Sequence, residues 1–332
     1  AIFGSTTSGM TLYATGVVDQ AGTVVKVLKI GYNTGSQGTL IVAGGSLDVK
    51  DTIIVSVSGL GRLVLSNGIL RATNSIAVGT QKDKPGGIIE IEGGYMQTPY
   101  LYLGQIRPGT LTQGGGTNRV TTKADISSTN AAPATYELRG GLFNPKALNI
   151  GVSGTGTVVI AEGCLDVNDT IAVGVSGPGR LVLSNGTLRA TNSIAVGTQS
   201  GMPDGTIEMA GGYMQTPSLN LGVLAPGTMT QDGGTNRVTN KADISSANAA
   251  PATYELRGGL FSPTFFSVGV SGTGTVVQTG GVLEILGGQP TTLGVNSGSV
   301  GNYRLENGTL KSYALYVGDH GQGVFTQTGG TN

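Results

Sequence analysis

Residues 62–81 read RLVLSNGILRATNSIAVGTQ, and residues 180–199 read RLVLSNGTLRATNSIAVGTQ, so a long stretch recurs with one substitution. The same offset of 118 residues relates Tyr136 to Tyr254. Self-similarity at a fixed period is typical of repeat proteins, whose units stack to bury a shared core. The chain is therefore predicted to be a repeat array.

A shorter unit lies inside the long one. A glycine or serine directly follows an apolar residue every 23 to 25 residues, and we call these residues anchors. They are Gly31, Ser56, Gly79, Gly104, Ser127, Gly151, Gly174, Gly197, Gly222, Ser245, Gly269, Gly294 and Gly318. Five units fill one 118-residue repeat, which predicts five-rung repeats at about 31–150 and 151–268 and a diverged partial copy at 269–332. The chain, 1–332, is expected to be one continuous solenoid of about fourteen such rungs.

Each short unit carries three pairs of alternating apolar residues. In one unit these pairs are Val158/Ile160, Leu165/Val167 and Ile171/Val173, with Gly, Ser, Asn or Asp between them. Alternation with a period of two indicates strands with one face inward, and 59 glycines supply the corners. The fold is predicted to be all-β, a single-stranded parallel β-helix (β-solenoid) with three short strands per rung and a right-handed coil as the expected hand.

Alignment on the Gly-Gly and Asn-Gly corners predicts two inward columns. The first contains Leu40, Leu63, Leu111, Tyr136, Val158, Leu181, Ile207, Met229, Tyr254, Val276, Tyr303 and Phe325, and the second contains Leu47, Leu70, Met96, Phe143, Leu165, Leu188, Met214, Phe261, Leu283 and Leu310. Gln113, Gln231 and Gln278 occupy inward positions of a third column, and Asn118 and Asn236 interrupt the second. Buried amides must be hydrogen-bonded, so all five are expected to bond backbone groups at the corners.

Composition limits the classes of partner. The chain has 19 basic and 19 acidic residues, which argues against a nucleic-acid partner or an anionic membrane surface. It contains no apolar run long enough to cross a bilayer, so no membrane insertion is expected. A single cysteine, Cys164, excludes an internal disulfide framework and is interpreted as a small residue at a turn.

Several units resemble the Gly-rich β-helix repeats of bacterial autotransporter passengers and PEP-CTERM-type secreted surface proteins. They include GTMTQDGGTNRV at 227–238, VGVSGTGTVVQTGG at 268–281 and GVFTQTGGTN at 323–332. The resemblance covers nearly the whole chain and implies a secreted protein, extracellular or at the cell surface. It supplies no catalytic residues.

Carboxylates that are candidates for catalysis lie on one outward face. They are Glu90, Glu92 and Glu137, with Arg139 beside them, and their counterparts in the next repeat are Glu208, Ala210, Glu255 and Arg257. Because one carboxylate is lost between the copies, a solvated set of ion pairs is the preferred interpretation, and no enzyme activity, catalytic residue or cofactor is predicted. No metal site is expected either, since the sole histidine, His320, has no second histidine or cysteine beside it.

Opposite charges alternate along an outward column, where they are expected to control register. The pairs are Asp48/Arg71, Asp166/Arg189 and Glu284/Lys311. No outward column is expected to be a regular threonine array, which leaves an ice-binding rod as a minor alternative.

Two kinds of segment are candidates for glycosylation. The protrusions at 127–135 and 245–253 are rich in Pro, Ala, Ser and Thr and include Thr129, Thr135 and Thr253, although plain solvated loops are the preferred interpretation. Asn168, Asn185 and Asn307 lie in N-x-T sequons.

The ends of the chain suggest how it assembles. Ala1, Ile2, Phe3 and Gly4 resemble the last strand of a rung, whereas the rung that contains Phe325, Gln327, Gly330 and Asn332 is incomplete. We therefore expect a structural subunit of an extracellular bacterial fibre or surface layer, a homopolymer stacked head to tail through uncapped ends, and a fragment of a longer solenoid would look the same. The alternatives are an adhesin or glycan-binding stalk, for which Tyr95, Tyr102, Tyr213 and Tyr316 are candidate sugar contacts, and, less favoured, a polysaccharide lyase or hydrolase.

Overall fold

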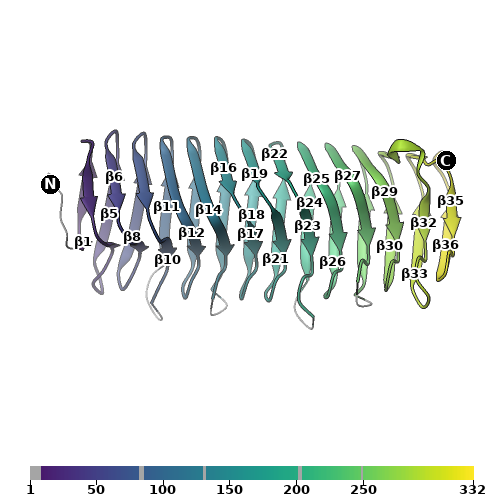
Figure 1. Ribbon diagram of the computed structural model, residues 1–332, viewed down its shortest axis with the longest axis horizontal. Helices are drawn as coiled ribbons and strands as arrows, with labels where there is room; N and C mark the ends of the chain where they lie inside the picture. The colour runs from purple at the N-terminus through teal and green to yellow at the C-terminus, as the bar shows by residue number, and fades with distance from the viewer. Residues whose placement is uncertain (1–8, 82–85, 130–131, 201–203, 248–249) are drawn as a thin grey trace. The chain divides into compact units, whose positions relative to one another are not determined.

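The structure is a computed structural model that describes residues 9–81, 86–129, 132–200, 204–247 and 250–332. The chain divides into two compact units, Ala1–Val167 and Asn168–Asn332, each of which is considered by itself. In both units short parallel strands are stacked rung on rung, and the pairings given for each unit are all parallel (Figure 1). The predicted class, an all-β parallel β-solenoid, is confirmed.

The first unit has two sets of strands. One set forms a single sheet: β2 (Thr15–Val18), β5 (Gln37–Val42), β8 (Leu60–Leu65), β11 (Gly87–Ile91), β13 (Gly109–Gln113), β15 (Ala134–Leu138) and β18 (Gly156–Ile160). The other set covers the remaining sides of the rungs: β1 (Met10–Leu12), β3 (Thr23–Val25), β4 (Leu28–Ile30), β6 (Ser46–Val49), β7 (Thr52–Val55), β9 (Ile69–Ala72), β10 (Ser75–Val78), β12 (Tyr95–Leu103), β14 (Thr117–Ile126), β16 (Leu142–Pro145), β17 (Leu148–Ile150) and β19 (Cys164–Val167).

The second unit repeats this plan. Its single sheet contains β21 (Gly179–Leu183), β24 (Gly205–Met209), β26 (Gly227–Gln231), β28 (Ala252–Leu256), β30 (Thr273–Gln278), β33 (Val300–Leu305) and β36 (Gln322–Gln327). The other strands are β20 (Thr170–Val173), β22 (Thr187–Ala190), β23 (Ser193–Val196), β25 (Tyr213–Leu221), β27 (Thr235–Ile244), β29 (Leu260–Val268), β31 (Val282–Glu284), β32 (Thr291–Leu293), β34 (Thr309–Lys311) and β35 (Leu315–Val317). A short 3-10 helix, η1 (Leu286–Gly288), follows β31.

Most rungs have the three short strands that the sequence predicts, as in β5, β6 and β7. In β12, β14, β25, β27 and β29 the second and third strands are instead continuous. The pairing of β12 with β14 shifts register between Thr98 and Tyr100, and the pairing of β25 with β27 shifts between Thr216 and Ser218. Such irregularities bend a strand and re-aim its side chains. The continuous strand therefore turns the corner by a bulge rather than by a short polar turn such as Lys50–Asp51.

The predicted anchor residues share one backbone conformation. All of them have φ between 61° and 72°, apart from Gly318 at 75°. Among the described residues the only non-glycines with positive φ are the three anchor serines, Ser56, Ser127 and Ser245. Each serine hydroxyl donates a hydrogen bond to a carbonyl within its own turn, for example Ser56 Oγ to Gly59 O at 2.7 Å, and this bond offsets the strain of the left-handed conformation.

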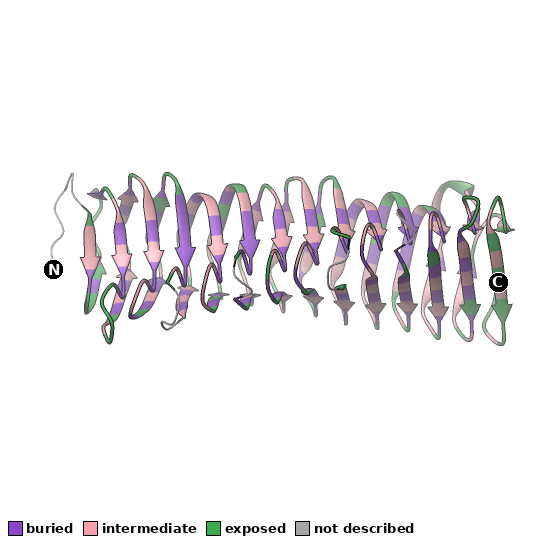
Figure 2. Cartoon of the chain, turned by 90° about the horizontal axis from the view of Figure 1, so that it is seen from below, coloured by how far each residue is buried: buried purple, intermediate pink, exposed green. Residues whose placement is uncertain are grey.

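The two predicted apolar columns are the core. Leu40, Leu63 and Leu111 of the first unit are fully buried. Ile89 lies between the last two in the column, because it is the Cα partner of both Leu63 and Leu111. Figure 2 shows buried residues alternating with exposed or intermediate ones along the strands, as the period of two predicts. In the second unit Phe325 differs from its column because it is only partly buried, although its ring lies 5.6 Å from that of Tyr303.

Each buried glutamine bonds the backbone of its corner, as predicted. In the first unit Gln113 Nε2 donates to Gly116 O at 3.2 Å and to Leu142 O at 3.0 Å. The prediction for the asparagines is wrong, because Asn118 Nδ2 donates to the hydroxyl of Tyr136 at 3.0 Å. That hydroxyl in turn donates to Gln113 Oε1, so a tyrosine links the two amides. The carbonyl oxygen of Asn118 has no partner among the described residues.

The second unit contains the same buried network. Tyr254 OH donates to Gln231 Oε1 at 2.5 Å and accepts from Asn236 Nδ2 at 3.3 Å. Tyr303 OH likewise donates to Gln278 Oε1. Burial raises the pKa of all three tyrosines above the ordinary tyrosine value.

The outward columns are partly as expected. Arg71 lies 3.6 Å from Asp48, and Lys311 lies 3.6 Å from Glu284, so two of the predicted register pairs are present within single units. The expectation that no outward column is a threonine array is wrong, because four threonines are Cα partners on consecutive rungs: Thr206, Thr228, Thr253 and Thr275. The first unit has only the shorter run Thr110, Thr135 and Thr157, which follows Ile88.

Candidate functional site

The charged face predicted from the sequence lies on β8, β11, β13 and β15. Arg62 of β8 reaches the next rung and binds both oxygens of Glu90, with Arg62 Nε 3.1 Å from Glu90 Oε1. Arg139 binds both oxygens of Glu137, at 2.7 and 2.8 Å. This hydrogen bonding raises the pKa of the Arg139 guanidinium. The predicted set of ion pairs is confirmed, and a substrate would have to displace a guanidinium from either carboxylate.

A shallow pocket of about 330 Å³ lies on this face. Its lining consists of Glu90, Ile91, Glu92, Thr112, Gly114 and Arg139. The pocket exists because Gly114 has no side chain, and a Cβ at this position would approach only Ile91 O, at 3.9 Å. The sequence did not reveal this pocket, since a missing side chain creates space without adding a chemical group.

The corresponding face of the second unit has the same ion pairs. Arg180 binds both oxygens of Glu208 at 2.7 and 2.6 Å, and Arg257 Nη2 lies 2.5 Å from Glu255 Oε2. The counterpart of Gly114 is Asp232, whose carboxylate lies 3.5 Å from Arg257. Ala210 replaces Glu92. A carboxylate has thus moved from one rung to the next, while the bidentate pairs are unchanged.

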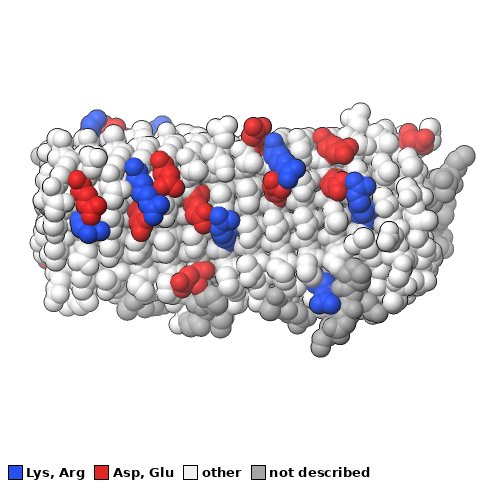
Figure 3. Space-filling model, turned by 180° about the vertical axis from the view of Figure 1, so that it is seen from behind, with Lys and Arg blue, Asp and Glu red and all other residues white. Residues whose placement is uncertain are grey.

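Figure 3 shows how charges are distributed on one side of the molecule, where red and blue side chains adjoin in small groups on a mostly uncharged surface. Exposed pairs of this kind contribute about 0 to 1 kcal/mol each. General acid catalysis by a carboxyl group instead relies on a site that is sheltered from water and keeps its proton near neutral pH. The carboxylates paired across rungs, Glu90 and Glu208, are therefore better suited to fixing the register of rungs than to proton transfer.

A pair of tyrosines lies on a different side of the first unit. Tyr100 and Tyr102 project outward from β12, and their rings are parallel to within 6° with centroids 5.9 Å apart. Their Cα partners on β10 are Ser75 and Ala77. Of this pair, only Tyr102 was predicted from the sequence to be a surface tyrosine, although Tyr100 shares its outward face of β12.

The other candidate tyrosines differ from this pair. Tyr95 OH donates to Gln97 Oε1 at 2.9 Å, and Tyr213 OH donates to Gln215 Oε1 at 3.0 Å, so both copies use this hydroxyl locally. Tyr316 is 53% exposed and lies on β35. Tyr95, Tyr213 and Tyr316 have no parallel aromatic partner among the described residues, so only Tyr102 belongs to a larger aromatic surface.

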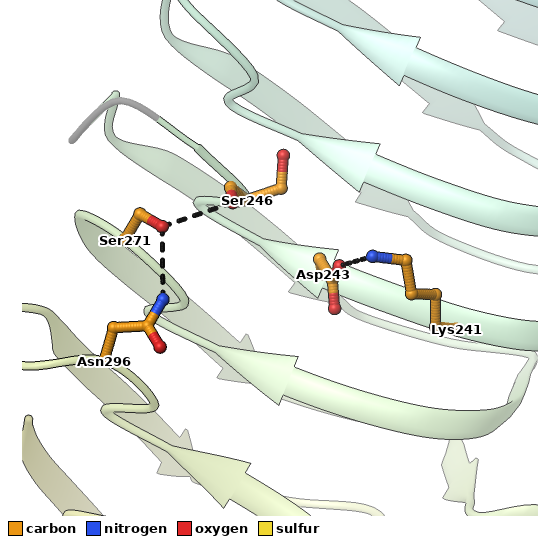
Figure 4. Close-up of polar contacts among 5 residues, drawn as sticks. All are labelled: Lys241, Asp243, Ser246, Ser271 and Asn296. Carbon is orange, nitrogen blue, oxygen red and sulfur yellow. Dashed lines mark hydrogen bonds and ion pairs between the residues drawn. The ribbon is translucent and has the colours of Figure 1, made fainter. Parts of the chain in front are cut away.

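A nearly buried carboxylate recurs beside the tyrosine positions. Lys123 Nζ lies 2.8 Å from Asp125 Oδ2 in the first unit, and Lys241 Nζ lies 2.6 Å from Asp243 Oδ2 in the second. The hydrogen bond that Lys123 donates to Asp125 raises the pKa of Lys123. Figure 4 shows the Lys241–Asp243 pair.

Figure 4 also shows a chain of polar contacts that links three successive turns of the second unit. Asn296 Nδ2 donates to Ser271 Oγ at 3.4 Å, and Ser271 Oγ donates to Ser246 O at 3.5 Å. Both distances are at the long end of the range for hydrogen bonds. These hydrogen bonds connect neighbouring turns, and none of them pairs a nucleophile with a general base.

The histidine and the cysteine lie apart from the charged face. The His320 side chain is 75% exposed, and its Nδ1 lies 3.2 Å from Asp319 Oδ2. Cys164 begins β19 and is partly buried. Across the described ranges no group of three or more His, Cys, Asp or Glu residues is arranged to hold a metal ion.

The candidate glycosylation residues fall into two classes. Asn168, Asn185 and Asn307 are exposed in turns between strands, and Thr129 is exposed with its hydroxyl donating to Gln105 O. Thr135 and Thr253 lie within β15 and β28 and are only partly exposed. The protrusions are therefore shorter than predicted, since they end before these two threonines.

The residues predicted to form the assembly interface are only partly covered by the structure. Ala1, Ile2, Phe3 and Gly4 lie outside the described residues. Near the other end Gln327 Nε2 donates to Gly330 O at 3.2 Å, Asn332 is exposed, and Thr331 forms an isolated parallel bridge with Thr309. Phe325 on β36 is only partly buried.

Comparisons with known proteins give no assignment: no protein-family model, no curated protein and no solved structure matches the chain. In the part of the chain that the structure covers, no helix has the length and apolar character needed to span a membrane.

Proposed function

We propose that this chain is a structural β-solenoid, a subunit of an extracellular fibre or surface layer, without catalytic activity. The observation that carries the proposal is the recurrence of the same bonded face in both units. Arg62–Glu90 and Arg139–Glu137 of the first unit reappear as Arg180–Glu208 and Arg257–Glu255 of the second. A chain that repeats this bonded face as well as its core is suited to a role in which length and regularity matter.

The extracellular setting is proposed from the repeat pattern of the sequence alone, as the predicted resemblance to passenger and secreted surface proteins implies. The polymeric setting is supported by the geometry of a rung. In a parallel stack, each rung pairs with the next through strand edges, and apolar inward residues complete the column. β36 pairs with β33, and its inward residue Phe325 is partly exposed. A further rung on this edge would bury Phe325, whether it came from a second copy or from a continuation of the chain.

We therefore propose head-to-tail stacking of copies, in which the residues Phe325, Gln327, Gly330 and Asn332 receive the N-terminal residues Ala1 to Gly4 of another molecule. Such a contact uses two different surfaces and does not close on itself, so it builds filaments. Backbone pairing of this kind adds a strand to an exposed edge.

Sedimentation of the purified chain at rising concentration tests this proposal. We expect the mass to grow with concentration, and we expect Phe325→Lys to abolish the growth because it places a charge where the next rung must bury it. Thr326→Lys is the matched control, since Thr326 faces outward on the same strand and its replacement should leave assembly intact. A monomer at every concentration, or growth unaffected by Phe325→Lys, would contradict the proposal.

A further inference from the structure

Tyr100 and Tyr102 lie side by side on β12, and the second unit has no aromatic residue at the corresponding positions. We propose that these tyrosines, with Ser75 and Ala77 beneath them, form a binding platform for a neutral glycan, and we call this surface the tyrosine platform. The tyrosines replace the residues Ser218 and Asn220 of the second copy. The proposal adds a ligand to the structural role and does not depend on polymerisation.

The rings lie against the neighbouring rung. Ser75 and Ala77 face outward but are only 8% and 5% exposed. Their counterparts Ser193 and Ala195, whose Cα partners are Ser218 and Asn220, are more exposed. The hydroxyl contact to the preceding rung is the same in both copies, since Thr52 and Ser75 in the first and Thr170 and Ser193 in the second are each 3.2 Å apart. The tyrosine on the following rung is therefore the change that covers Ser75.

The fold does not require aromatic residues at these positions. β25 keeps the length, the bulge and the register of β12 with Ser218 and Asn220 in place of the tyrosines. A partly exposed aromatic ring leaves apolar area in water, which contributes nothing to stability. Two adjacent rings that the strand can do without are thus better explained by a ligand than by the folding of the rung.

The hydroxyl groups of the platform are available to a ligand. Neither the Tyr100 nor the Tyr102 hydroxyl makes a hydrogen bond within the described ranges, unlike that of Tyr95, which donates to Gln97. Tyrosine presents an apolar ring and a polar tip, which suits a ligand with both kinds of surface. A pyranose ring is such a ligand, because its axial C–H groups pack on aromatic rings while its hydroxyls donate and accept hydrogen bonds.

The charge beside the platform favours a neutral ligand. Lys123 Nζ lies 2.8 Å from Asp125 Oδ2, and Asn149 Nδ2 donates to Asp125 Oδ1 at 2.8 Å. The lysine is thus neutralised by a carboxylate that is only 5% exposed. Among the described residues beside the platform, a phosphate-bearing polymer or an anionic lipid surface would find no unpaired positive charge, whereas a neutral sugar requires none.

The size of the platform also separates a glycan from a protein partner. Two tyrosine side chains supply at most about 500 Å² when fully exposed, and these two are half-buried. A stable protein interface buries about 800 Å² on each partner. The outward neighbours are small or polar, so the aromatic surface does not continue far enough for such an interface.

Saturation-transfer NMR with the full chain and three neutral probes tests the proposal: cellohexaose, chitohexaose and maltohexaose. We expect at least one probe to bind at concentrations up to about 10 mM. Replacing the tyrosines by the residues of the second copy, Tyr100→Ser with Tyr102→Asn, should raise the Kd about tenfold or more, because both stacking contacts are lost. The variant is expected to fold, since the second unit uses these residues in the same strand.

The second copy also supplies a gain-of-function control. Ser218→Tyr with Asn220→Tyr should create a second site and raise the binding stoichiometry. The proposal is overturned if no probe binds, or if Tyr100→Ser with Tyr102→Asn leaves the Kd unchanged. It is also overturned if the double variant abolishes self-association of the chain instead, since the platform would then be an interface between copies.

Discussion

The two copies of the long repeat differ on their surfaces far more than in their interiors. Gln113, Tyr136 and Asn118 form a buried network that the second unit reproduces residue for residue. On the surface, Tyr100 has become Ser218 and Gly114 has become Asp232. The interior is held by packing and by hydrogen bonds that must all be satisfied, whereas an outward position constrains only its immediate neighbours. Differences between the copies are therefore where an acquired function should be sought.

The largest expected effect comes from alkaline pH. Burial raises the pKa of Tyr136, Tyr254 and Tyr303 in the folded chain, while in the unfolded chain each titrates near pH 10. Above about pH 10 the unfolded state loses protons that the folded state keeps, so stability is retained below this pH and falls as pH rises further. By pH 11 the three tyrosines together should cost about 4 kcal/mol.

Denaturant unfolding between pH 8 and pH 11, followed by far-UV circular dichroism, measures this loss. Tyr136→Phe and Tyr254→Phe should each reduce the pH dependence by the same amount, because the two networks are alike. A stability that does not change across this range would show that the tyrosines are accessible to water in the folded state.

Removal of a network glutamine should have the next largest effect. Gln113→Leu leaves the Tyr136 hydroxyl without its acceptor, and we expect a loss of about 1 to 3 kcal/mol in the free energy of unfolding. Gln231→Leu should cost the same in the second unit. Leucine fits this column because Leu65 and Leu183 occupy it on other rungs. Unequal losses would mean that the two interiors are not equivalent.

The sequence predicted the columns and the backbone partners of the buried glutamines, but not the partners of the buried asparagines. The period of two and the spacing of 23 to 25 residues determine which residues stack, and this spacing located every anchor with positive φ. The partner of Asn118 could not be predicted, because Tyr136 reaches it from the next rung. Tyr100 shares the outward face of the predicted Tyr102, but periodicity alone does not show that two outward side chains stack on each other.

Serine and glycine can be exchanged at an anchor position that differs between the two copies. Ser56 of the first unit corresponds to Gly174 of the second, where an added Cβ would lie 2.8 Å from Gly205 Cα. We expect Gly174→Ser to destabilise the chain by about 1 to 3 kcal/mol, because both the clash and the left-handed backbone oppose it.

Ser56→Gly should cost about 1 kcal/mol or less, since relief of backbone strain offsets the lost hydrogen bond to Gly59 O. Thermal unfolding of both variants under one set of conditions measures the asymmetry. Equal losses would indicate that the serine anchor is no better accommodated than a serine at Gly174.

The smallest effects are expected at the ion pairs. Arg62→Gln and Arg180→Gln each remove a bidentate bond to a carboxylate on the next rung, and we expect a loss of less than about 1 kcal/mol for either, diminishing further in high salt. Chemical denaturation at low and high salt makes the comparison. A loss of several kcal/mol of unfolding free energy in only one unit would indicate that its charged face does more than fix the register of the rungs.

Electron microscopy of the purified chain tests the central claim, that a repeated surface and core serve to build an extended structure. The account predicts filaments that lengthen as the protein concentration rises, and short separate particles for Phe325→Lys under the same conditions. Separate particles of the unmodified chain at every concentration, or filaments formed equally well by Phe325→Lys, would contradict it.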